Sequence, residues 1–70
     1  MSSEAEAIKE LRADILDRER KIQATTDSLD RARLIDKSIA WANEQLRGWE
    51  ENGPGAEALI DFAMWADEQL

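Results

Sequence analysis

The chain has 70 residues and carries sixteen acidic against nine basic side chains, for a net charge of −7. A chain of this length forms one domain at most and buries a core of marginal size. Its charge has the wrong sign for binding phosphates, so we expect no direct contact with nucleic acid. With no cysteine and no histidine, the chain lacks disulfides and the ligands that zinc prefers.

The composition favours an all-helical protein of the cytoplasm. Hydrophobic residues make up 43% of the chain, which argues against disorder. Alanine, leucine, acids and arginine dominate, whereas valine and tyrosine are absent, and this mix favours helices over strands. We expect no secretory leader in Met1–Glu4 and no membrane span, because no apolar run approaches about 20 residues. The lack of cysteine favours a reducing compartment.

The first predicted helix covers residues 3–24. Ser3 and Glu6 form a capping box at its start. Its main apolar residues share a narrow stripe of about 60°, as in a coiled-coil seam. They are Ile8, Leu11, Ile15 and Ile22. Arg18 occupies the empty seam position, where its aliphatic stem can cover the stripe. Leu16 lies off the stripe, and we expect it to face a second neighbour.

The second predicted helix covers residues 27–52 and is capped by Thr25 or Thr26. Its apolar side chains share an arc of about 180°, which suits a helix that packs against two others. They are Ala32, Leu34, Ile35, Ile39, Trp41, Ala42, Leu46 and Trp49. Gly48 interrupts this helix, where it permits a close helix approach or marks a kink.

The third predicted helix covers residues 55–70. Gly53 is placed for a left-handed C-cap of the preceding helix, and Pro54 blocks its continuation. Apolar residues surround the last helix almost completely, so we expect it to be buried on several sides or to dock onto a partner. The predicted fold is a single all-α domain, 1–70, with an antiparallel helical hairpin and a shorter third helix, like a three-helix bundle. We expect a core of Ile8, Leu11, Ile15, Ile22, Ile35, Ile39, Leu46 and Leu59.

No residue pattern indicates an enzyme, a metal site or a cofactor site. Nucleophilic catalysis without histidine requires a lysine base, and the three lysines fall on polar helix faces. Carboxylates share helix faces at Glu10 with Asp14 and at Glu57 with Asp61, but no Glu-x-x-His motif or EF-hand loop accompanies them. The glycines around Pro54 follow a helix and lack the lysine of a phosphate loop. We therefore expect no enzymatic activity and no cofactor.

The charge imbalance is concentrated at the C-terminal end. Residues 1–24 have a net charge of −1, residues 25–49 are neutral, and residues 50–70 carry −6 without a single base. The acids of this last segment are Glu50, Glu51, Glu57, Asp61, Asp67 and Glu68. Phe62, Met64 and Trp65 lie among them, and such residues are enriched at interface cores. We predict a binding surface for a basic protein, with Phe62 or Trp65 as its anchor; the alternative is a core helix with a solvating acidic side.

Two functions are compatible with these features. The first is an inhibitor or adaptor of a basic, nucleic-acid-handling protein. In size and charge the chain resembles the small acidic inhibitors of phages and mobile elements, such as anti-CRISPR and anti-restriction proteins, which can present carboxylates where phosphates would lie. The second is a self-associating structural or regulatory protein, such as a homodimeric coiled coil or an antitoxin-like partner. The narrow stripe of the first helix and the apolar circumference of the last favour a homodimer.

Overall fold

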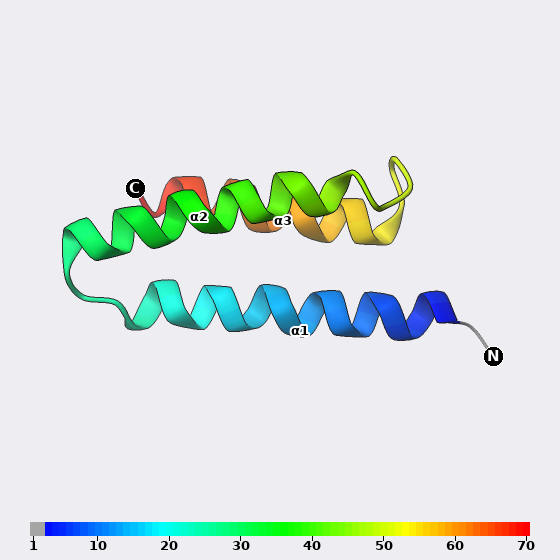
Figure 1. Cartoon of the computed structure of the whole chain (residues 1–70), viewed down its shortest axis with the longest axis horizontal. Coiled ribbons are helices and arrows are strands. Elements are labelled where there is room, and N and C mark those ends of the chain that lie inside the picture. The colour runs from blue at the N-terminus through cyan, green and yellow to red at the C-terminus, as the bar shows by residue number, and fades with distance from the viewer. Residues whose placement is uncertain (1–2) are drawn as a thin grey trace.

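The computed structural model describes residues 3–70. Within this range the chain forms three α-helices and no strand: α1 (Ser3–Ala24), α2 (Ser28–Leu46) and α3 (Pro54–Glu68). α1 and α2 form an antiparallel hairpin, and α3 runs back along α2, so α1 and α3 point the same way (Figure 1). The molecule is elongated, with extents of 43 × 19 × 15 Å. The predicted all-α fold is confirmed; residues 1 and 2 of the predicted domain lie outside the described range.

The turn between α1 and α2 is closed by a cap on each side. The backbone N–H and the hydroxyl of Thr25 both donate to the Lys21 carbonyl, at 3.1 and 2.7 Å, and end α1. The Asp27 carboxylate accepts from the N–H groups of Leu29 and Asp30 at 3.1 and 3.0 Å. The N-cap of α2 is therefore Asp27 and neither preceding threonine. A carboxylate is favoured there because its charge also complements the helix dipole.

The connection between α2 and α3 begins earlier than predicted. α2 ends at Leu46, well before residue 52, and the chain then makes successive turns through residues 47–53. The left-handed residue is Asn52, with φ 66°, whereas Gly53 is extended, with φ −82° and ψ 172°. The reason is Pro54, which confines the preceding residue to extended backbone and starts α3 as its first helical residue. Asparagine tolerates the left-handed region better than most residues.

Trp49 belongs to this connection and not to a helix face. Its half-buried indole lies so close to the backbone of Gly55 that a Cβ on Gly55 would overlap the ring. The close approach that the sequence suggested at Gly48 is found at Gly55 instead. Gly48 is exposed, and a Cβ there would meet nothing nearer than the Gln45 carbonyl oxygen at 3.5 Å. The tryptophan thus fixes the loop against the start of α3.

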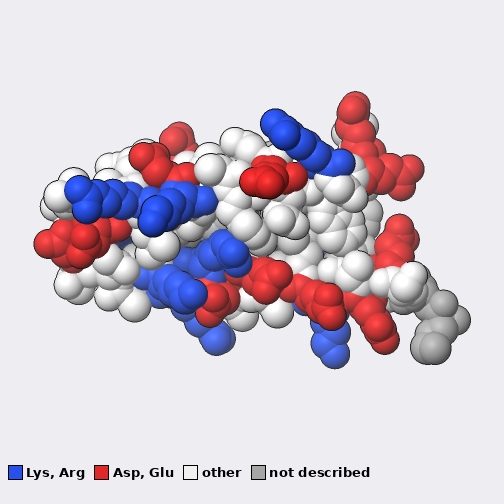
Figure 2. Space-filling model, in the orientation of Figure 1, with Lys and Arg blue, Asp and Glu red and all other residues white. Residues whose placement is uncertain are grey.

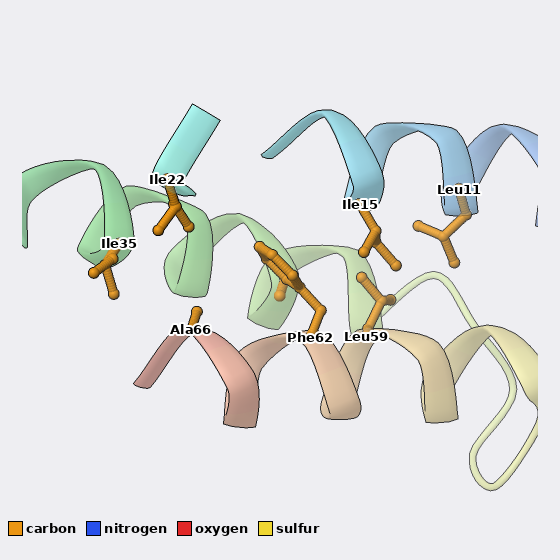
Figure 3. Packing of buried hydrophobic residues seen from close by; sticks show 8 residues of the cluster. Leu11, Ile15, Ile22, Ile35, Leu59, Phe62 and Ala66 are labelled. Atoms are coloured by element: carbon orange, nitrogen blue, oxygen red, sulfur yellow. The ribbon is translucent and has the colours of Figure 1, made fainter. Parts of the chain in front are cut away.

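The core lies along the line where the three helices meet. α2 and α3 have the most extensive contact, and α1 packs along both. The buried hydrophobic residues are Leu11, Ile15, Ile22, Ile35, Ala42, Ala56, Leu59, Phe62 and Ala66. In Figure 3, Leu11 and Ile15 of α1 point toward Leu59 of α3. The wide apolar face of α2 packs against both neighbours, as predicted.

Five of the eight predicted core residues are buried: Leu11, Ile15, Ile22, Ile35 and Leu59. Ile8, Ile39 and Leu46 are only half-buried. Ile39 and Leu46 still pack against the core cluster, but from its edge. A bundle of three helices leaves each helix only two neighbours, so residues at the margin of an apolar arc keep one side in solvent.

Two arginines stabilise the ends and the seam of the bundle. The Arg18 guanidinium lies 3.7 Å from the ring centroid of Trp41, and the residue is half-buried, which fulfils the seam-covering role predicted for it. Arg31 donates through Nε to the Ile22 carbonyl at 3.3 Å. It also donates to the Gln69 backbone carbonyl at 3.3 Å and to the Gln69 side-chain oxygen at 3.0 Å. Arg31 therefore joins the ends of α1 and α3 to the start of α2.

We expect Gly55→Ala to destabilise the protein by about 1–3 kcal/mol, because the new methyl group must displace the Trp49 indole. Gly48→Ala is the matched control, since its methyl group has space and no positive φ opposes it. Its stability should equal or exceed that of the wild type by up to about 1 kcal/mol. Urea unfolding of both variants measures the difference. Equal free energies of unfolding for the two variants would show that the close contact between Trp49 and Gly55 does not contribute to stability.

Replacing Arg31 with methionine should lower the free energy of unfolding by about 2 kcal/mol, because three hydrogen bonds from a partly buried charged group are lost. Arg33→Met on the same helix is the control, because Arg33 is exposed and such surface changes stay within about 0.5 kcal/mol. Thermal unfolding of the pair gives the result. If Arg31→Met lowers the free energy of unfolding no more than Arg33→Met does, the hydrogen bonds from Arg31 to Ile22 and Gln69 do not contribute to stability.

Candidate functional site

All six acids of the predicted site are exposed. Glu50 and Glu51 lie in the connection between α2 and α3, apart from the others. The remaining four, Glu57, Asp61, Asp67 and Glu68, share a sector of about 120° on the outer side of α3, which we term the acidic face. None of these four forms an ion pair with another residue of the range 3–70. Their charge is therefore not neutralised within the described part of the chain.

Two large apolar side chains are exposed within the acidic face. Ile60 and Met64 are 46% and 61% exposed and lie one helical turn apart. Neither was among the predicted site residues, although Met64 was noted as an interface type. The signal that identifies them is their position on the helical wheel, opposite the buried Leu59 and Ala66. The face thus combines free carboxylates with an apolar centre.

Phe62 lies in the core and borders a hollow between α1 and α3 with only a small exposed surface. Its side chain is only 3% exposed. The ring meets Trp41 of α2 edge-on, with centroids 6.1 Å apart, and stacks on Trp65 at 6.2 Å. Phe62 shares its helix side with Leu59 and Ala66 and faces α2, so its burial argues against the anchor role that the sequence predicted for it.

Trp65, the other predicted anchor, lies at the boundary between core and surface. It is half-buried and packs on Phe62, yet it also lines a hollow between α1 and α3 together with Glu19, Ala58 and Asp61. Trp65 is thus both a packing residue and a partly accessible aromatic surface. Of the two predicted aromatic anchors, only Trp65 retains access to solvent.

A groove runs between α1 and α3. Its main part has a volume of about 540 Å³ and is lined by Arg12, Ile15, Leu16, Glu19, Pro54, Glu57, Ala58 and Asp61. The hollow beside Trp65, about 280 Å³, shares four of these residues and continues the groove along α3. We call the two together the α1–α3 groove. Leu16, for which the sequence predicted a second neighbour, is 44% exposed here, so nothing in residues 3–70 covers it fully.

Basic side chains gather on a different face. A smaller pocket between α1 and α2 is lined by Arg18, Lys21 and Lys37 together with Leu34, Ser38 and Trp41. Figure 2, viewed with α2 in front of α3, shows lysine and arginine side chains on this face with acidic side chains between them. Among the basic side chains of this pocket, Lys21 alone has an ion-pair partner within residues 3–70, namely Asp17 at 3.1 Å. α1 and α2 thus carry charges of both signs, whereas the only charged side chains of α3 are carboxylates.

The described residues offer several surfaces with hollows between the helices. Within residues 3–70, no cluster of three or more acids could hold a metal ion. In the same range, none of the helices has the length and apolar character needed to cross a bilayer. Comparisons of the chain with protein-family models, with curated proteins and with solved structures give no match. Function is therefore inferred from the geometry of the acidic face and of the α1–α3 groove.

We expect Trp65→Ala to lower stability by about 2 kcal/mol, because it removes the ring that packs on Phe62. Met64→Ala should change stability by less than about 0.5 kcal/mol, since Met64 is 61% exposed. Differential scanning calorimetry of both variants measures this. If Trp65→Ala and the wild type have the same melting temperature, the contact between Trp65 and Phe62 does not stabilise the core. Trp65→Ala would then change only the surface of the protein.

Proposed function

We propose that this chain is a non-enzymatic protein-binding module that inhibits or sequesters a basic, nucleic-acid-handling protein. The observation that supports the proposal is the acidic face of α3. Its four carboxylates form no ion pair with any residue of the range 3–70, α3 contains no lysine or arginine, and Ile60 and Met64 are exposed between the acids. In size and charge the chain resembles the phage inhibitors of anti-CRISPR and anti-restriction type.

The two components of the face would act at different stages of binding. Carboxylates on one side of a rigid helix attract a basic surface over a distance and raise the association rate. Ile60 and Met64 then make apolar contacts that slow dissociation. A surface of the partner that normally holds phosphates would be occupied by carboxylates, which excludes its nucleic acid by competition. The partner therefore needs a basic groove and some apolar surface next to it.

The test uses a variant that neutralises the acidic face: Glu57→Gln, Asp61→Asn, Asp67→Asn and Glu68→Gln. The matched control removes the same total charge elsewhere, from exposed acids of α1 and α2: Glu10→Gln, Asp14→Asn, Asp36→Asn and Glu44→Gln. Each protein is used to capture partners from the native host, and the captured partner is then assayed for nucleic-acid binding and for its association rate.

We expect the acidic-face variant to associate at least about tenfold more slowly than the wild type, and the control variant to stay within about twofold. Added salt should weaken wild-type binding, because it screens the steering charges. Wild-type protein should displace nucleic acid from the partner. Equal association rates for the two variants, or a partner that keeps its nucleic acid, would overturn the proposal.

Self-association is the second candidate, and the exposed Leu16, Ile60 and Met64 favour it. The salt dependence separates the two functions. A dimer formed through α3 brings like charges together, so added salt should strengthen it, whereas binding to a basic partner weakens with salt. Sedimentation equilibrium across the micromolar range, at low and high salt, distinguishes a dimer from a monomer.

A further inference from the structure

We infer that the α1–α3 groove is the binding site for a basic amphipathic helix of the partner, which lies along α1 and α3 as a fourth helix. This inference rests on the proposed function and specifies both the site and the chemical class of its ligand. The proposed function requires that the acidic face of α3, with Ile60 and Met64 between its acids, contacts a basic protein. The groove adds a shape, and the shape determines which structural element of that protein it accepts.

The shape of the groove fits a helix. α1 and α3 point in the same direction and lie side by side, and a channel between two neighbouring helices is the place where a further helix packs. On α3 the lining extends from Pro54 to Trp65, which is about 16 Å at 1.5 Å per residue, or three helical turns. No strand edge exists within residues 3–70, so an extended peptide would find no backbone partners there.

The floor of the groove is apolar. Ile15 and Leu16 of α1 face Ala58 of α3, and the Trp65 ring continues this floor toward the C-terminal end. Leu16 is the most open of these, at 44% exposure, while Ala58 and Trp65 are half-buried. A helix with apolar residues at positions i, i+3 or i+4, and i+7 would cover this floor with one side.

The rim of the groove decides the charge of the ligand. Glu19, Glu57 and Asp61 border it, against one base, Arg12. Glu68, on the same side of α3 as Glu57 and Asp61, extends the negative charge toward the end of the helix. Lysine and arginine on the flanks of the bound helix would therefore face carboxylates on both sides. A second copy of this chain is a poor occupant, because each copy carries a net charge of −7 and α3 has no base.

The probe is a synthetic peptide of about 15 residues, about 22 Å as a helix. It contains leucine, alanine and lysine, with the leucines on one helical stripe. A control peptide has the same composition with the leucines distributed around the helix, so that charge and length are equal. Titration of isotope-labelled protein, followed by NMR, reports affinity and the residues affected. Circular dichroism reports whether the bound peptide becomes helical.

We expect the amphipathic peptide to become helical on binding and to shift the backbone signals of Leu16, Ala58 and Asp61 most. The control peptide should bind at least about tenfold more weakly, because it cannot cover the apolar floor. Equal affinity of the two peptides would overturn the inference, since charge alone would then explain the binding. Signal changes confined to Ile60 and Met64 would also overturn it.

Paired variants locate the site. Leu16→Gln should weaken binding of the amphipathic peptide at least about fivefold, because part of the groove floor is lost. Leu29→Gln is the control, since Leu29 is 59% exposed and lies outside the groove. Both substitutions preserve charge, and thermal unfolding verifies that both variants fold. Equal peptide affinity of the two variants would contradict a site in the groove.

The same variants separate this inference from the function on which it rests. If the natural partner responds to the acidic-face variant but not to Leu16→Gln, the proposed function holds and the groove inference fails. If the partner binds both variants as it binds the wild type, the proposed function fails. Binding of a basic helix in the groove is then tested only by the difference in affinity between the amphipathic and the control peptide.

Discussion

The structure depends on the packing of one side of α3 against α2. Leu59, Phe62 and Ala66 recur at helical spacing and are almost completely buried. Phe62 is the centre of this contact, because its ring meets Trp41 across the helix interface and Trp65 along its own helix. Aromatic pairs of this kind add to the area that they bury. In a chain of 70 residues with no disulfide, such a contact is a large part of the available core.

This contact determines what α3 presents to solvent. Once Leu59, Phe62 and Ala66 face α2, the geometry of the helix places Ile60, Met64 and the four acids on the other side. The apolar character of α3 on several sides therefore has two sources: a core stripe, and an exposed pair that no other helix within residues 3–70 covers. The Trp49 contact with Gly55 holds the start of α3 in place, so the acidic face is presented on a rigid element.

The position of α1 creates the groove. α1 contributes Leu11, Ile15 and Ile22 to the core, and its narrow stripe leaves the side toward α3 incompletely filled. Leu16 lies on that side, in the channel between the two helices. On the opposite side, the Arg18 guanidinium packs over Trp41 beside the smaller α1–α2 pocket, and Arg31 joins the helix ends. The α1–α3 groove is therefore bordered mainly by acids, and the acidic face of α3 beside it is the basis of the proposed function.

Local chemistry made much of the fold predictable. The 3.6-residue period, the breaker at Pro54 and the turn residues after Ala24 identify three helices, and α1 begins and ends at the predicted residues. The narrow stripe of α1, the wide face of α2 and the covering role of Arg18 also follow from spacing alone. The absence of bases from residues 50–70 is a property of the sequence, and so is the expectation that these acids are exposed.

Other features were decided by tertiary contacts. The periodicity predicted that α2 continues through Trp49, but α2 ends at Leu46 and the Trp49 indole packs on Gly55 from the following connection. Phe62 and Trp65 are similar as interface candidates in the sequence. Only the position of α2 buries Phe62 and leaves Trp65 at the edge. The groove could not be predicted, because it belongs to the space between α1 and α3. Periodicity indicates which side of a helix is apolar, and the packing of all three helices decides how much of that side remains uncovered.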